Sequence, residues 1–144
     1  MKVVDANLLL YAVDERSPRH AGARSWLEET LSGGETVGLA WVVLLAFIRV
    51  STRASVFERP LEVGGALDLV DGWLAQPCTT VLEPSPRHHK VLRELLEPLG
   101  SAGNITSDAH LAAIALEHGA DLYSCDRDFA RFNGVRWRDP LARE

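Results

Sequence analysis

Two aspartates follow a short strand-like run near the carboxyl end of the chain. The segment DLYSCDRDFARF, residues 121–132, places Asp126 and Asp128 one residue apart directly after that run. One polar residue would be enough to end a strand, so a pair of carboxylates indicates a chemical role. Another strand-like run, Lys2 to Val4, ends on Asp5. Because functional groups gather beyond the carboxyl ends of parallel strands, we expect Asp5 and Asp126 to lie at one edge of a sheet.

A third carboxylate begins a stretch with helical spacing. Asp108 lies in the first turn of the helix expected from 108 to about 117, where the helix dipole and the free amides favour an ionised side chain. Leu111, Ala112 and Ala115 follow it at helical spacing, so Asp108 shares the face that packs on the sheet. A carboxylate on such a face is costly unless it is paired or binds a metal ion.

Together these carboxylates form a candidate metal site: Asp5, Asp108, Asp126 and Asp128. Like charges at close range raise one another's pKa and destabilise the fold, and a divalent cation removes that repulsion. Oxygen donors without His or Cys favour magnesium, with manganese as an alternative, over zinc. Each residue also has a simpler interpretation: Asp5 and Asp128 can cap helices, and Asp108 can be an ordinary first-turn charge. Their joint occurrence predicts the metal centre.

The apolar pattern alternates between strands and helices. Strand-like runs are Lys2–Val4, Thr36–Leu39, Thr79–Leu82, Leu122–Ser124 and a possible fifth at Val135–Trp137. Helical spacing covers 7–13, 18–31, 41–53, 60–76, 86–99 and 108–117. This alternation predicts an α/β sandwich with a mainly parallel sheet of four to five strands. The 144 residues contain no linker or repeat, so we expect a single domain over 1–144.

Charge gives a mixed indication about nucleic acid. A net charge of -5 has the wrong sign for a protein that binds polyanions by bulk electrostatics. Arginines nevertheless lie near the acids or on the helix 41–53, as candidates for contacts with RNA phosphates or with an acidic partner: Arg49, Arg53, Arg127 and Arg131. Arg49 and Arg53 are expected one helical turn apart. The alternative is a solvated surface.

The sequence also indicates where in the cell the protein acts and whether cysteine or histidine could bind a metal. The apolar run 37–48 is shorter than the roughly 20 residues that cross a bilayer, and Asp5 interrupts any signal-peptide core. We therefore expect a cytoplasmic protein with no membrane contact. The two cysteines and five histidines show no metal-ligand spacing. The histidines are interpreted as surface or packing residues, and Trp41 is expected to pack in the core.

Three segments resemble the PIN-domain ribonucleases, and most closely the VapC toxins of bacterial toxin-antitoxin pairs. They are VVDANLLLYAVD (3–14), LAWVVLLAFIRVSTR (39–53) and TSDAHLAAIALEHGADLYSCDRDFARF (106–132). The most specific features are the Asp-x-Asn at Asp5, the helix that begins at Asp108, and SCDRDF, where serine stands in place of the family's usual threonine.

The resemblance implies a PIN-like three-layer sandwich and a magnesium-dependent endoribonuclease that acts as a toxin. Such enzymes hydrolyse RNA phosphodiesters with a metal-activated water and leave 5'-phosphate and 3'-hydroxyl ends. A cognate antitoxin, whose C-terminal segment lies across the active site, holds them inactive, and they are usually homodimers. Matched residue by residue, the family's metal and catalytic ligands fall on Asp5, Asp108 and Asp126, its accessory acid on Asp128, and its supporting polar residues on Asn7 and Ser124.

One position departs from the family pattern. A glutamate common in the helix after the second strand falls on Ala46, and no acid lies between Glu35 and Glu58. The number of metal ions, one or two, therefore stays open, and so does a weak or inactive protein that binds antitoxin or RNA without turnover. A receiver or phosphohydrolase is a further alternative, but DANLL lacks the second aspartate of that motif and no lysine follows the last strand.

Overall fold

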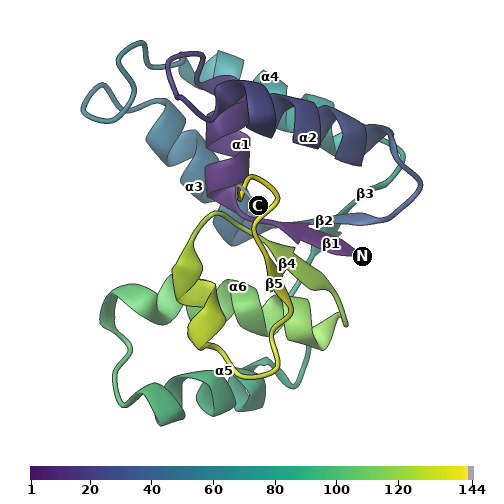
Figure 1. Cartoon of the computed structure of the whole chain (residues 1–144), viewed down its shortest axis with the longest axis vertical. Coiled ribbons are helices and arrows are strands. Elements are labelled where there is room, and N and C mark those ends of the chain that lie inside the picture. Colours follow the sequence, from purple (N-terminus) through teal and green to yellow (C-terminus); the bar gives the residue numbers. More distant parts are fainter. Residues whose placement is uncertain (143–144) are drawn as a thin grey trace.

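A five-stranded, fully parallel sheet forms the centre of the molecule (Figure 1). The computed structural model describes residues 1–142. The strands are β1 (Lys2–Val4), β2 (Val37–Ala40), β3 (Thr79–Leu82), β4 (Asp121–Tyr123) and β5 (Trp137–Arg138), and their order in the sheet is β3-β2-β1-β4-β5. The predicted α/β sandwich with a parallel sheet is confirmed.

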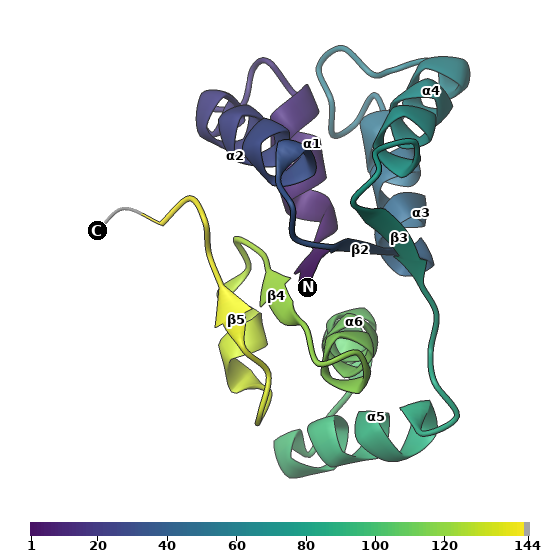
Figure 2. The same ribbon diagram turned by 90° about the vertical axis from the view of Figure 1, so that its right-hand side faces the viewer.

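Helices cover both faces of this sheet, which gives three layers. The helices are α1 (Ala6–Val13), α2 (His20–Ser32), α3 (Trp41–Ser51), α4 (Val63–Leu74), α5 (His88–Leu96) and α6 (Thr106–Glu117). Figure 2 shows α1 to α4 on one face and α6 on the other, with α5 on the outer side of α6. Three short 3-10 helices complete the fold: η1 (Glu97–Leu99), η2 (Gly103–Ile105) and η3 (Arg127–Arg131).

Some helix bounds differ from those expected from the sequence. Helix α3 ends at Ser51, and Thr52, the residue that caps it, donates its hydroxyl hydrogen to the carbonyl of Ile48 at 2.7 Å. Arg53 therefore lies beyond the helix, and the expectation that it stands one helical turn from Arg49 is wrong. Helix α2 begins two residues after Pro18, and α6 begins two residues before Asp108, where 3-10 helix η2 leads directly into it.

The topology places the ends of β1 and β4 side by side. From β1 the chain continues to β2 and β3 on one side of the sheet, and later adds β4 and β5 on the other. In the β1–β4 pair, Val4 stands opposite Tyr123, and the amide of Asp5 donates to the carbonyl of Tyr123 at 3.0 Å. This is a topological switch point, where crevices of parallel sheets lie.

The hydrophobic core holds these strand ends in place. Val3 and Leu122, on the two strands that meet there, are fully buried, as expected for a parallel sheet covered on both faces. Gly38 in β2 leaves room for β3, because a Cβ atom there would lie 2.9 Å from the Cγ atom of Leu82. Phe129 of η3 is fully buried and anchors the segment that carries Asp128. Along residues 1–142, no helix has both the length and the apolar character that crossing a membrane requires.

Candidate metal centre

Three carboxylates converge where α6 meets the segment after β4. Asp108, Asp126 and Asp128 each contribute one oxygen, and these oxygens all lie within 4.8 Å of one another. Asp108 comes from the first turn of α6, Asp126 from the residue before η3, and Asp128 from η3 itself. A single small cation can contact oxygens at this spacing once the side chains close on it.

Asp5 lies against this group and also begins helix α1. Its Oδ1 atom accepts a hydrogen bond from the amide of Ala6 at 2.7 Å, so the simpler helix-cap interpretation of Asp5 holds as well. Asp5 and Asp108 line one cavity of about 180 Å³. Ala46 and Arg49 of α3 line the same cavity. The position where the family commonly has glutamate therefore faces the site and carries only a methyl group.

A hydrogen-bond network centred on Ser124 joins the ends of β1 and β4. The fully buried Ser124 hydroxyl donates to Oδ2 of Asp5 at 2.7 Å and accepts from the side-chain amide of Asn7 at 2.9 Å. It also accepts from the backbone amide of Asp126 at 3.0 Å. The Asn7 side-chain oxygen accepts from the amide of Cys125 at 3.2 Å. The supporting residues named from the sequence thus fix the acids that flank them.

Asp126 and Asp128 are arranged by the 3-10 turn itself. Oδ1 of Asp126 accepts from the amide of Asp128 at 2.9 Å, so Asp126 is the residue that caps η3. The expectation that Asp128 could cap this helix is therefore wrong. Asp128 is exposed, and the buried ring of Phe129 next to it holds the turn against the core.

Burial and mutual repulsion make this cluster strongly electronegative. Burial, followed by the negative charges of Asp126, Asp5 and Asp128, raises the pKa of Asp108 to about 6. Burial also raises the pKa of Asp5, although the hydrogen bonds from Ser124 and Ala6 oppose the shift. Burial is the largest cause of both shifts, and the neighbouring anions add to it. A divalent cation would reverse them.

Two of the four candidate arginines lie next to the acids. Arg49 lines the cavity that Asp5 and Asp108 share. Arg131, at the end of η3, lines a neighbouring hollow of about 240 Å³ together with Asp128. Arg127 is exposed at the start of η3 and Arg53 is exposed beyond α3. The structure assigns no contact to the acids for these last two.

Sequence reasoning missed several polar residues at the site. Ser107 lines the Asp5–Asp108 cavity, and Ser101 and Asn104 line the hollow beside Asp128. They lie in or next to a loop with no periodic pattern, so only the fold brings them to the acids.

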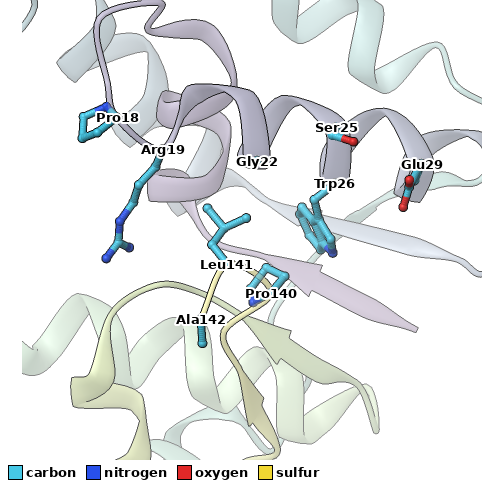
Figure 3. Close-up of a pocket in the computed structure, with 9 residues that line it drawn as sticks. All are labelled: Pro18, Arg19, Gly22, Ser25, Trp26, Glu29, Pro140, Leu141 and Ala142. Atoms are coloured by element: carbon cyan, nitrogen blue, oxygen red, sulfur yellow. The ribbon is translucent and has the colours of Figure 1, made fainter. Parts of the chain in front are cut away.

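A larger hollow of about 730 Å³ lies elsewhere, between α2 and residues 140–142 (Figure 3). Trp26 and Glu29 of α2 lie on one side of it, and Leu141 of the carboxyl-terminal segment lies on the other. None of the four acids lines it. Size therefore does not identify the functional site here; the converging carboxylates do.

Comparison with known proteins identifies the family. The sequence matches the PIN domain family over residues 2–135, and the chain belongs to this family. It is 48% identical over 142 residues to Ribonuclease VapC37 of Mycobacterium tuberculosis, covering 99% of each chain. It is 41% identical over 141 residues to Ribonuclease VapC33 of the same species, covering 98% of this chain and 99% of the relative. The resemblance to PIN-domain proteins of the VapC type is confirmed.

Solved structures show the same fold at low sequence identity. The toxin-antitoxin complex VapBC2 from Rickettsia felis, bound to a promoter DNA fragment, contains a chain with a TM-score of 0.70 and 19% identity, covering 95% of this chain and 96% of that one. VapC20 of Mycobacterium tuberculosis is described as a sarcin-ricin loop cleaving toxin. It gives a TM-score of 0.64 and 18% identity, covering 94% of this chain and 99% of that one. The three-layer PIN architecture is thus confirmed.

The Ser124 network leads to a first prediction. Ser124→Ala should destabilise the metal-free protein by about 1–3 kcal/mol, because buried groups of Asp5 and Asn7 lose their partner. Thermal unfolding at fixed pH measures this change. Ser124→Thr is the matched control, because it keeps the hydroxyl and should retain more stability than Ser124→Ala. Equal melting temperatures for Ser124→Ala and the natural protein would contradict the role assigned to this hydroxyl.

The raised pKa of Asp108 leads to a prediction about pH. Folding raises this pKa from 3.8 to about 6, so the folded state binds the proton more tightly, and stability is lost as pH rises through 6. In EDTA at pH 7.5, Asp108→Asn should therefore be more stable by about 1–2 kcal/mol, after allowing for solvent screening of this half-buried group. Near pH 4 the difference should vanish.

Melting curves across this pH range make the comparison. The control is Asp68→Asn, which removes an exposed charge on α4 and should show no such pH-dependent gain. A metal-free Asp108→Asn protein that is less stable than the natural one at pH 7.5 would show that no repulsion is stored at this site.

Proposed function

We propose that this protein is a metal-dependent endoribonuclease that acts as the toxin of a toxin-antitoxin pair. The observation that carries the proposal is the convergence of the Asp108, Asp126 and Asp128 oxygens within 4.8 Å of one another, beside Asp5, at the switch point of a PIN-family sheet. The names of the relatives support it, since VapC37 and VapC33 are both called ribonucleases.

The donor set fits magnesium, with manganese as a substitute. All four side chains are carboxylates, which hard cations prefer, and none of the cluster is His or Cys. The mutual repulsion that raises the pKa of Asp108 supplies the electrostatic drive for binding. When bound, the ion supplies Lewis-acid polarisation of the phosphodiester and a water of lowered pKa.

The chain's own residues hold and orient the reacting groups. Asp108, Asp126 and Asp128 hold the cation, while Asp5 faces the same cavity as Asp108. The Ser124 hydroxyl fixes Oδ2 of Asp5, which limits the freedom of that carboxylate as the substrate enters. Asp108 must lose its proton to act as a ligand, so below a pH of about 6 the cation has to compete with that proton.

Arginines at the cavity suit an anionic substrate. Arg49 lines the Asp5–Asp108 cavity and Arg131 lines the hollow beside Asp128, so they flank the acids. A phosphate on either side of the cleaved bond can accept their hydrogen bonds. These local cations offset the overall charge of -5, and RNA is recognised mainly at unpaired loops, where the backbone is accessible.

The methyl group of Ala46 supports a site with one cation. A glutamate at this wall of the cavity would provide a further carboxylate, and alanine provides none. Magnesium usually keeps several waters in its coordination shell and binds through few carboxylates. The remaining acids are therefore sufficient for one ion.

An apolar groove supports an antitoxin partner. A hollow of about 160 Å³ lies between α1, α2 and α4, and it is lined by Ala12, Val13, Leu27, Leu31, Leu69 and Trp73, with Arg24 and Glu28. Such a groove fits apolar side chains of a partner segment. The structure of VapBC-1 from nontypeable Haemophilus influenzae contains a chain of the same fold, with a TM-score of 0.70 and 17% identity, covering 98% of each chain.

The exposed face of α3 supports a homodimer. Trp41 and Leu45 lie four residues apart on this helix and are 48% and 58% exposed. The expectation that Trp41 packs in the core is therefore wrong, since nearly half of its surface is exposed. Because α3 also carries Ala46 and Arg49, a second copy seated on this face would lie close to the metal centre.

The direct test of the function is RNA cleavage. We expect the protein to cut single-stranded or looped RNA in Mg²⁺, to leave 5'-phosphate ends, and to lose activity in excess EDTA. Asp5→Asn should lower the rate by roughly 100-fold or more, because the site loses a positioned carboxylate. Asp68→Asn, on exposed α4 surface, is the control and should retain full activity. Gel analysis of labelled RNA measures both.

Two outcomes of this cleavage assay would contradict the proposed function. Equal cleavage in excess EDTA would exclude a metal mechanism. Binding of RNA without turnover in both Mg²⁺ and Mn²⁺ would favour the alternative, a PIN protein that binds antitoxin or RNA but does not cleave.

The dimer has its own test. Sedimentation of the protein without antitoxin should show a dimer, and Leu45→Glu should shift it to a monomer, because burying an unpaired charge in an apolar interface is costly. Glu62→Gln, an exposed position before α4, should leave the dimer intact. A monomeric natural protein at every concentration would contradict the homodimer.

A further inference from the structure

A second set of metal-binding side chains lies between α5 and α6, outside the acidic cluster. The Nε2 atom of His88 lies 2.9 Å from the Nδ1 atom of His110. The two rings stand nearly perpendicular, at 81°, with their centroids 4.8 Å apart. The other nitrogen of His88, Nδ1, lies 2.6 Å from Oε2 of Glu117. The proposed nuclease function uses none of these residues.

The Glu117 carboxylate is built into the structure as an anion. Its side chain has 0% of its surface exposed. Oε1 accepts from the amide of Ser85 at 2.8 Å and from the Ser85 hydroxyl at 2.5 Å. Burial opposes the charge, but the hydrogen bonds from Ser85 and His88 outweigh it and lower the pKa of Glu117. An ionised carboxylate can only accept hydrogen bonds.

This carboxylate sets the tautomer of His88. Since Glu117 accepts, Nδ1 of His88 carries a proton, which leaves Nε2, the nitrogen that faces Nδ1 of His110, as the one that can bind a metal. A histidine whose second nitrogen donates to a carboxylate is the usual arrangement of a metal ligand, because the carboxylate orients the ring and makes it more basic. Here the remaining nitrogen faces a second imidazole.

We propose that His88 Nε2 and His110 Nδ1 form a site for a divalent transition metal such as Zn²⁺ or Cu²⁺, with Glu117 orienting His88. The metal takes the place of the proton that the two nitrogens share, and His110 carries its proton on Nε2 instead. Two Zn–N bonds of about 2.0–2.1 Å at a tetrahedral angle set the nitrogens about 3.3 Å apart. The 2.9 Å separation therefore has to widen by a few tenths of an ångström, and the two rings have to tilt so that both nitrogens point at the metal.

Solvent can complete the coordination of this metal. The His88 side chain is 16% exposed and His110 is half-buried, so water reaches the pair, whereas Glu117 is closed off. Nitrogen donors suit Zn²⁺ and Cu²⁺, whereas a cluster of carboxylates suits Mg²⁺. Because Zn²⁺ can also bind carboxylates, the imidazole nitrogens themselves have to report on this site. The proposal does not depend on the nuclease function.

Metal binding at this pair would join two helices. His88 begins α5 and His110 lies in α6, whose first turn carries Asp108. The His88–Glu117 contact already links the same helices, and Ser85, which lies before α5, also donates to Glu117. The metal therefore adds a cross-link near the nuclease site without contributing a group to it.

The experiment uses the full chain in excess Mg²⁺, with Zn²⁺ as the probe. Long-range proton–nitrogen NMR spectra of the histidine rings should show large shifts of His88 Nε2 and His110 Nδ1, and none for His118, whose Nε2 contacts the carbonyl of Glu83. Zn²⁺ at about a hundredfold excess over its Kd should also raise the melting temperature by about 5–10 °C.

Variants give the matched comparison. His88→Gln should abolish the imidazole shifts and the thermal gain, and Glu117→Gln should weaken Zn²⁺ binding by about 10–100-fold. His118→Gln, at the residue that follows α6, should bind Zn²⁺ like the natural protein. Cu²⁺ should show coupling to two imidazole nitrogens in electron paramagnetic resonance, which carboxylate binding cannot produce.

Measurements on the natural protein alone can contradict the proposal. The test therefore does not depend on whether the variants fold. Zn²⁺ that leaves the nitrogens of both rings unshifted, or Cu²⁺ with oxygen ligands only, would reduce the pair to a hydrogen bond that fastens α5 to α6. Shifts at His118 equal to those at His88 would mean unspecific surface binding, and would overturn it as well.

Discussion

The site depends on a single buried hydroxyl that joins two distant parts of the chain. Ser124 bonds to Asp5, 119 residues away in sequence, and also to Asn7 and to the amide of Asp126. Because the hydroxyl is fully buried, these groups have no solvent to replace it. The ends of β1 and β4 are thereby held in one arrangement, and the carboxylates that follow them are held with them.

That arrangement carries an electrostatic cost. Burial and the neighbouring anions raise the pKa of Asp108 to about 6, which means that the metal-free fold stores repulsion at neutral pH. The fold tolerates it because buried Val3 and Leu122 anchor the two strands, and buried Phe129 anchors η3. Carboxylates with raised pKa values, held together by the surrounding fold, are typical of functional sites.

Helix α6 serves two polar groups of different chemistry. Its first turn carries Asp108, in the cluster of hard oxygen donors, whereas His110 and Glu117 belong to a nitrogen-rich pair with α5. In the acidic cluster like charges face each other and need a cation. In the histidine pair, the Glu117 carboxylate already accepts hydrogen bonds from Ser85 and His88. The nitrogens available to a metal are those through which His88 and His110 face each other. The two groups therefore differ in which metals they favour and in what binding would change.

Sequence alone determined the strands, the helices and the acidic cluster. Apolar periodicity predicts a parallel sheet, and the carboxyl ends of parallel strands share an edge, so Asp5 and Asp126 had to approach each other. Their neighbours Asn7 and Ser124 followed from the same segments through the family resemblance.

Only the tertiary structure decided the rest. His88 and His110 are separated by 22 residues, and His88 and Glu117 by 29, with no repeating spacing to relate them. The sequence also could not predict that Trp41 and Leu45 on α3 are exposed. An apolar helix has the same sequence pattern whether its own chain covers it or leaves it exposed. Both depend on how the helices pack on one another and on the sheet, which local patterns do not encode.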